Sequence, residues 1–533
     1  EHVLKNRQQD QHIRSVSIGG NHVVAGGQTF VDYRLAWAEA GEFQPDRLDT
    51  IFRQTGINFA PNVSAGSIHP DNIQPNPSSN DASRATLNAW QTERFATTDR
   101  DLTASFNVRM PLAFADNSAS FLKFGAKVKD KAKDRTFEIG SASPTSTVPF
   151  AQLQDTTFDN DRFLDFQGAG YGAFPGINAD ASRALFNALP AGRYEVDPEG
   201  DASAYDATER VYAGYAMAEM YLGSKLTFVT GVRVESTTVD YAGNEVLYNA
   251  DGDYESTSRV TGGDRYTFLL PGAHLRYAIT DRTNIRAAYT RTIARPNYYD
   301  LVPYQLVFQE DNEIARGNPN LKPTSSNNLD LLAEHYFQSI GVVSGGVFYK
   351  RLSDYIYTFR ENQNVFGDTY EVTLPLNGEE ASLWGAEISL QNRLTFLPGP
   401  FDGLGVYVNY TFTDSSATFP DRTGSANLPG QSQHLGNVSF SYEKAGFMAK
   451  TSWNLHGRYV DEVGADASED VYYDTHTQFD INLSQQINRR ARVYADFMNL
   501  TNAPLRYYIG ETNRPIQEEY YKFWASFGVK LNW

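Results

Sequence analysis

The chain has 533 residues, no cysteine, a formal net charge of −18, 32 tyrosines and 33 phenylalanines. The lack of cysteine excludes disulfides and thiolate metal sites, and the negative charge argues against nucleic acid as a partner. With a mean hydropathy of −0.47 and no apolar run of about 18 residues, the sequence excludes a transmembrane helix. The composition does not exclude a membrane β-barrel, because the strands of a barrel place their apolar residues only at alternate positions.

Apolar and polar residues alternate in short segments, which is the pattern of β-strands with one apolar face. The first strand is predicted over residues 12–20, with a glycine-rich turn at 19–22, and no strand is predicted in residues 1–11. The second strand covers residues 30–39. Residues 40–98, with five prolines and several Asn, Asp and Ser clusters, are predicted to be a long polar loop.

The alternation then continues in pairs of strands to the C-terminus. These strands are predicted over residues 101–112, 121–129, 211–222, 226–239, 266–279, 284–295, 328–337, 342–357, 382–396, 404–413, 434–442, 448–460, 477–487, 492–500 and 520–533. With the first two they make about seventeen strands, joined alternately by short turns and long loops, as in outer-membrane barrels. In the long loop 130–208, the glycine-rich segment 168–172 is predicted to be flexible rather than phosphate-binding, and residues 179–189 a short helix.

The last strand, residues 520–533, shows the alternation most clearly. Its odd-numbered residues from Tyr521 to Trp533 are all apolar or aromatic, whereas the even-numbered residues are mixed and mostly polar. A soluble edge strand this apolar would invite aggregation, so we predict that the odd-numbered face contacts lipid. Because an odd number of antiparallel strands cannot close a barrel, we expect this strand to pair outside residues 1–533 rather than with residues 12–20.

A series of short motifs resembles one protein family. The motifs are G-V-R-V-E at 231–235, T-R-T-I-A-R-P-N-Y at 290–298, G-N-P-N-L-K-P at 317–323, N-L-D at 328–330, E-H-Y-F at 334–337, F-Y-K at 348–350, G-A-E at 385–387 and N-L-T-N at 499–502. In order and spacing they resemble the barrel of TonB-dependent outer-membrane receptors, of the subgroup common in Xanthomonas- and Caulobacter-type bacteria.

The resemblance implies an all-β, transmembrane antiparallel β-barrel of 22 strands with a plugged lumen. Residues 1–533 would then be the C-terminal barrel portion with the last seventeen strands, and the signal, TonB box, plug and first five strands would precede Glu1. It also implies the outer membrane of a Gram-negative bacterium, a lipid surround, and coupling through the plug to the TonB–ExbB–ExbD complex. A surface lipoprotein is a further candidate partner, and no cofactor is expected.

The residues alone do not exclude two other classes of function. A passive porin would show the same strand pattern, and some outer-membrane barrels are enzymes. The nine histidines show no H-x-x-x-H spacing and no G-x-S-x-G elbow occurs, so the sequence nominates no catalytic residue and no metal ligand. An active importer of a scarce nutrient is therefore favoured over an enzyme.

The predicted loops are rich in aromatic residues beside Asn, Asp and Gln, which suits sugar faces and hydroxyls and also aromatic metal chelates. The candidate ligand-binding residues are Trp90, Tyr171, Tyr298, Tyr299, Tyr304, Tyr472 and Tyr507. Packing of one loop against another is the alternative role for such rings. Because the loops are acidic overall, we expect a neutral oligosaccharide rather than an anion, with a ferric siderophore or other metal chelate as the alternative ligand.

Overall fold

The structure is a computed structural model. It describes residues 1–533 apart from 25, 59–80, 113–118, 158–175, 250, 252, 309–311, 339, 366, 420, 421, 423, 465, 533 and the side chain of Glu361. Within the described residues, no helix is both long enough and apolar enough to cross a membrane.

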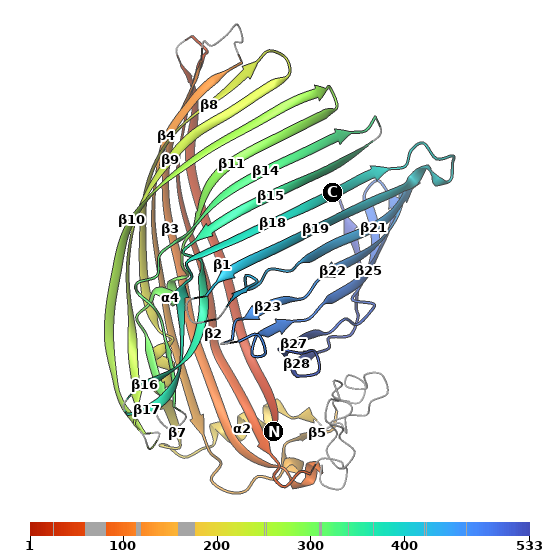
Figure 1. Cartoon of the computed structure of the whole chain (residues 1–533). Helices are drawn as coiled ribbons and strands as arrows, with labels where there is room; N and C mark the ends of the chain where they lie inside the picture. Colours follow the sequence, from red (N-terminus) through yellow and green to blue (C-terminus); the bar gives the residue numbers. More distant parts are fainter. Residues whose placement is uncertain are drawn as a thin grey trace.

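Seventeen strands of the described chain form one antiparallel ladder, in which each strand pairs with the next one around the wall (Figure 1). In order they are β1 (His2–Val24), β2 (Thr29–Arg53), β3 (Thr86–Pro111), β4 (Phe121–Ala142), β8 (Tyr205–Leu222), β9 (Leu226–Tyr248), β10 (Tyr254–Thr280), β11 (Thr283–Ala294), β14 (Thr324–Tyr336), β15 (Gly341–Ser353), β18 (Glu380–Arg393), β19 (Leu404–Thr418), β21 (His434–Lys444), β22 (Phe447–His456), β25 (His476–Asn488), β26 (Ala491–Met498) and β29 (Trp524–Leu531). This ladder confirms the predicted all-β class and the predicted strand number.

The shorter elements lie in the connections between wall strands. They are η2 (Ala82–Arg84), η3 (Phe150–Gln152), β5 (Gln154–Asp155), β6 (Gly176–Ile177), α2 (Ala179–Asn187), β7 (Tyr194–Asp197), α3 (Glu199–Ala202), α4 (Tyr298–Leu301), β12 (Gln305–Phe308), β13 (Glu313–Arg316), β16 (Ile356–Val365), β17 (Asp368–Asn377), η4 (Phe401–Gly403), β20 (Ser425–Ala426), β23 (Tyr459–Glu462), β24 (Val471–Tyr473), β27 (Leu505–Ile509) and β28 (Pro515–Glu519). Helix α2 confirms the helix predicted over residues 179–189, with Asn178 as its N-cap.

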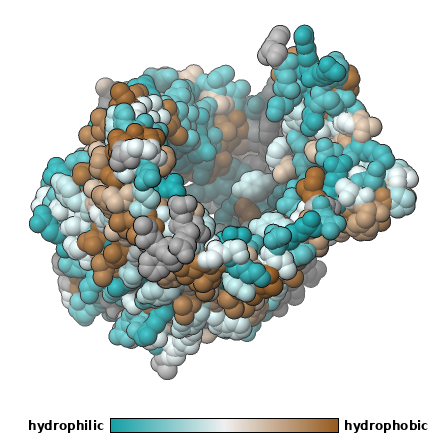
Figure 2. Space-filling view, turned by 90° about the horizontal axis from the view of Figure 1, so that it is seen from above, coloured by the Kyte–Doolittle hydropathy of each residue, from teal (hydrophilic) through white to brown (hydrophobic). Residues whose placement is uncertain are grey.

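The two rims of the wall differ. Turns as short as 223–225 and 445–446 join strands at one rim, and the long connections fold at the other rim, at the bottom of Figure 1. Seen from the side of the short turns, the wall curves around a central hollow (Figure 2). Among the described residues, β1 pairs only with β2 and β29 only with β26, so the wall is open between β1 and β29 and residues 12–20 do not pair with the last strand, as predicted.

Several strands extend farther toward the long-loop rim than predicted. The prediction of no strand in residues 1–11 is wrong, because β1 begins at His2, and residues 19–22 lie inside β1 rather than in a turn. The predicted loop 40–98 is also too long, because β2 continues to Arg53 and β3 begins at Thr86. These extensions stand beyond the apolar band, where neither face needs to be apolar, so alternation gives no signal there.

The outward face of the wall carries the apolar band. Leu102 and Phe106 on β3 and Val347 on β15 are exposed, as are the odd-numbered residues Phe527 and Val529 of the last strand. The lipid-facing side that the sequence predicted for residues 520–533 is therefore the outer side.

The inward face of β9 carries paired charges. Glu235 accepts hydrogen bonds from Arg233, at 2.6 Å, and from Arg295, at 2.7 Å. Arg233 and Glu235 therefore form ion pairs on the inner side of the wall, as a polar lumen allows.

Replacing Val347, in the middle of β15, with arginine should destabilise the folded barrel by about 2–4 kcal/mol, because the charge would face the centre of the lipid band. The matched control is Ser344→Arg, on the opposite face of the same strand, where Glu334 pairs with it in the ladder. Urea unfolding in lipid vesicles measures both variants. Equal losses for the two would contradict the assignment of faces.

Candidate ligand-binding site among the loops

The β12–β13 hairpin joins the extension of wall strand β9 to the β16–β17 hairpin at the long-loop rim. β12 pairs in parallel with β9, and β13 pairs in parallel with β17. The apolar residues between them are fully or nearly fully buried: Val307, Ile314, Tyr370 and Val372. The loops around the mouth are therefore held in sheets with their own small cores.

A first group of predicted residues, Tyr298, Tyr299 and Tyr304, lies together in the connection between β11 and β14. The rings of Tyr299 and Tyr304 stack with centroids 4.4 Å apart, and all three rings pack against a buried cluster that contains Val302. Burial raises the pKa of the Tyr299 hydroxyl. The structure thus brings these residues together, with much of their surface used in packing the loop.

A second group of tyrosines lies in a separate four-stranded sheet of β23, β24, β27 and β28. Tyr472 stacks on Tyr508 with centroids 5.3 Å apart and planes at 14°. Tyr507 meets Tyr473 edge to face at 5.1 Å. The predicted residues Tyr472 and Tyr507 therefore lie on neighbouring strands, β24 and β27.

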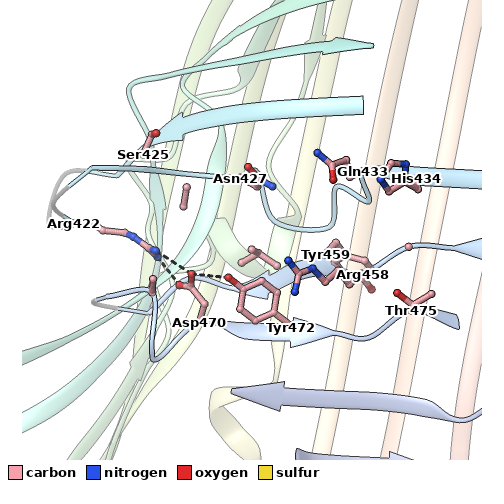
Figure 3. A pocket seen from close by; sticks show the side chains of 14 residues that line it. Arg422, Ser425, Asn427, Gln433, His434, Arg458, Tyr459, Asp470, Tyr472 and Thr475 are labelled. Carbon is pink, nitrogen blue, oxygen red and sulfur yellow. Dashed lines mark hydrogen bonds and ion pairs between the residues drawn. The ribbon is translucent and has the colours of Figure 1, made fainter. Parts of the chain in front are cut away.

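A pocket of about 500 Å³ lies beside this sheet (Figure 3). Its walls come from the connections between β19 and β21 and between β22 and β25. The polar and aromatic side chains that line it are Arg422, Ser425, Asn427, Gln433, His434, Arg458, Tyr459, Asp470, Tyr472 and Thr475. Of the predicted residues, Tyr472 lines this pocket.

An ion pair fixes the floor of the pocket. Arg422 donates two hydrogen bonds to the Asp470 carboxylate, one of them 3.0 Å long, and their side chains are 9% and 2% exposed. The backbone N–H of Gly464 and the hydroxyl of Tyr472 also donate to Asp470, at 3.0 and 3.4 Å. The hydrogen bonds to Asp470 raise the pKa of Arg422, and the ion pair joins the two connections.

A second arginine is available to a ligand. The guanidinium of exposed Arg458 lies 5.9 Å from the centroid of the Tyr472 ring, and within the described part of the chain no acidic side chain pairs with it. Asn427 and Gln433 add amide donors and acceptors, and Thr475 adds a hydroxyl. This combination can bind an oxygen-rich molecule through an aromatic face, several hydrogen bonds and one cation.

The remaining two predicted residues lie elsewhere. Trp90 lies within β3 rather than in a loop, and it is 1% exposed because it packs between β2 and helix α2. Its indole N–H donates to Ser182 Oγ at 2.9 Å, which is the position of a packing residue. Tyr171, with the glycine-rich segment 168–172, lies outside the described residues.

Sequence reasoning missed the polar side of the pocket. Arg422, Asn427, Gln433 and Arg458 come from two connections that meet only in the folded chain. No local signal separates them from other polar loop residues, whereas tyrosines are distinctive in a loop. Among the described residues, no group of three or more His, Asp or Glu side chains is placed to hold a metal ion.

An antiparallel wall with an apolar outer band, short turns at one rim and long folded loops at the other defines a membrane β-barrel protein of the outer-membrane type. Residues 33–500 match the family described as TonB dependent receptor-like, beta-barrel, and the chain belongs to this family. Such receptors are proteins of the Gram-negative outer membrane. A comparison with curated proteins finds no match.

Solved structures of the same fold include three receptors. The closed form of the ferric-catecholate import receptor Fiu from E. coli K12 has a TM-score of 0.60 at 13% identity, over 98% of this chain and 64% of Fiu. The pyoverdine receptor FpvA from Pseudomonas aeruginosa PAO1 has a TM-score of 0.58 at 14% identity, over 99% and 62%. The siderophore receptor PiuA from Acinetobacter baumannii has a TM-score of 0.56 at 10% identity, over 98% and 65%. The chain thus spans less than two thirds of the length of these receptors.

Proposed function

We propose that residues 1–533 form the barrel of an active importer in the outer membrane of a Gram-negative bacterium. The loops capture a scarce nutrient, and the TonB–ExbB–ExbD complex, acting through a plug, opens a path along the lumen. Membership of the TonB-dependent receptor family supports this mechanism, and the pocket among the loops supports capture at the mouth. Membrane lipid surrounds the apolar band, and a surface lipoprotein is a further partner for the loops.

The ligand we propose is an oligosaccharide. The observation that carries it is the pocket lined by Tyr472, Asn427, Gln433 and Thr475. A flat ring offers a face to a sugar ring, and amides and hydroxyls match the mixed donors and acceptors of sugar hydroxyls.

A ferric chelate is the second candidate ligand. It is favoured by Arg458, whose charge has no acidic partner among the described residues, and by the names of Fiu, FpvA and PiuA, which are ferric-catecholate, pyoverdine and siderophore receptors. Their 10–14% identity relates the folds and leaves the ligand to be measured.

Calorimetry of the receptor against a panel of oligosaccharides and ferric chelates tests the ligand. Tyr472→Ala should weaken binding of the cognate ligand about tenfold, because the ring supplies the apolar face of the pocket. The control is Tyr254→Ala, an exposed tyrosine at the start of β10 outside the pocket, which should leave affinity unchanged. If both variants bind like the parent, the ligand does not occupy this pocket.

Uptake measurements separate active import from the porin class. In cells that express the receptor, uptake of the cognate ligand should stop when TonB is deleted or the proton gradient is collapsed. Uptake that survives both treatments would identify a passive porin. Turnover of the ligand by the purified protein would identify an enzyme.

A further inference from the structure

The inward face of β4 carries a row of positive charges, which we term the basic stripe: Lys123, Lys127, Lys129, Lys131, Lys133 and Arg135. These residues fill six of the seven alternate positions from Lys123 to Arg135, and the seventh is Gly125. Alternate residues of a strand share one face, so the stripe runs along the wall from near the short-turn rim toward the mouth.

Contacts show that the stripe faces the lumen. Phe124 and Val128, on the opposite face of the same strand, belong to the exposed outer band. The ammonium of Lys131 lies 5.1 Å from the ring centroid of Tyr298, in a connection that folds over the inner side of β9. On neighbouring β8, Val211 is buried opposite Lys129 in the ladder, as expected under a long side chain that lies along the inner wall.

The stripe is only partly neutralised. Lys129 pairs with Asp101 at 2.9 Å, and Lys131 pairs with Asp99 at 3.0 Å. In the part of the chain that the structure describes, Lys123, Lys127 and Lys133 have no acidic side chain within 4 Å.

Arg135, at the mouth end of the stripe, packs against aromatic rings. Its guanidinium lies 4.9 Å from the ring centroid of Phe137 and 5.6 Å from that of Phe95.

Such a row is unfavourable without a counter-charge. Neighbouring residues of the stripe are about 7 Å apart, within the Debye length of physiological salt, so their charges repel each other. An anion that lies along β4 would relieve this repulsion. The chain as a whole is acidic, so the positive charge on this face is a local property that total charge conceals.

We propose that the basic stripe binds a carboxylate-bearing ligand, an acidic oligosaccharide, as it moves along the inner wall; the inference rests on the proposed import of an oligosaccharide. A chain of uronic-acid type places one carboxylate on each sugar, and several can face successive side chains of the stripe. This proposal differs from the neutral ligand that the acidity of the loops favours.

The test compares two probes of equal length, a galacturonic-acid pentamer and its fully methyl-esterified form, which has the same rings without the charges. Calorimetry with the receptor at low salt should give at least about fivefold tighter binding of the acid, and salt of about 0.5 M should remove most of the difference. Equal affinities of acid and ester at low salt overturn the proposal and leave oligosaccharide import standing. If neither pentamer binds, the stripe proposal is overturned, and the oligosaccharide panel under Proposed function decides whether another oligosaccharide is the ligand.

The variant for this test is K127Q/K133Q, which removes two charges that lack an ion pair among the described residues. It should weaken acid binding about fivefold and leave ester binding unchanged. The control is K225Q, which removes one exposed charge in the turn between β8 and β9 and should change neither. Unchanged acid binding in K127Q/K133Q overturns the proposal. If the melting temperature of this variant is also lowered, the stripe contacts an acidic protein segment instead.

Discussion

Asp470→Ala should detach the connection between β22 and β25 from the pocket floor, at a cost of about 3–5 kcal/mol to the local structure. The reason is burial: the Arg422 side chain is 9% exposed, and without Asp470 it loses the carboxylate that accepts two of its hydrogen bonds. Gly464 N–H and the Tyr472 hydroxyl lose their acceptor in the same step. Hydrogen exchange of residues 457–475 measures the opening, and ligand affinity should fall with it.

An exposed ion pair in another loop provides the control. Arg360 and Glu371 lie 3.7 Å apart with side chains more than half exposed, so Glu371→Ala should cost less than about 1 kcal/mol. Replacing both members of the buried pair, as R422M/D470L, should restore much of the protection, because no unpaired charge remains. Unchanged exchange in Asp470→Ala would show that the stacked tyrosines alone hold this connection.

Trp90→Ala should destabilise the β2–β3 extension and helix α2 by about 3–5 kcal/mol, because it leaves a large cavity among buried side chains. The ring of Phe186 on α2 meets the indole edge to face, with centroids 6.0 Å apart. Ser182 Oγ accepts the hydrogen bond of the indole N–H and lies 2.6 Å from Thr50 Oγ1. Limited proteolysis should cut the variant near α2 before the wall unfolds.

The matched control is Trp384→Ala on the outer face of β18, where about half the residue is exposed and, among the described residues, it belongs to none of the buried clusters. This variant should lose much less stability in a thermal melt. A Trp90→Ala protein with the parent's stability but weakened ligand binding would instead restore the ligand-contact role that the sequence predicted.

The strands in the membrane could be predicted because lipid and a wet lumen impose opposite demands on alternate residues. The face of Leu102 and Phe106, and that of Phe527 and Val529, could be read directly for this reason. The extension of β1 back to His2 could not be predicted from the sequence. Its pairing with β2 is made by backbone groups, and backbone pairing leaves no trace in side-chain alternation.

The candidate site was predicted less completely. Tyr472 could be chosen because an aromatic ring in a polar loop stands out, but Trp90 stands out equally and is buried in packing. Arg458 and Asn427 reach the pocket through long-range folding of two connections. The total charge of −18 does not decide the charge of the ligand, because it sums the loops, the lumen and the outer wall, whereas a ligand meets one surface at a time.

The parallel pairing of β12 with β9 and of β13 with β17 has a consequence for engineering. The β12–β13 hairpin, from the connection between β11 and β14, supplies backbone partners to β9 and to β17. A graft of that connection alone from a related receptor would leave the edges of β9 and β17 without partners. Altered ligand preference should therefore require transplanting the segments around β9, β12–β13 and β16–β17 as one set. Single substitutions of pocket residues outside the Arg422–Asp470 pair, such as Arg458, by contrast, leave this backbone pairing intact.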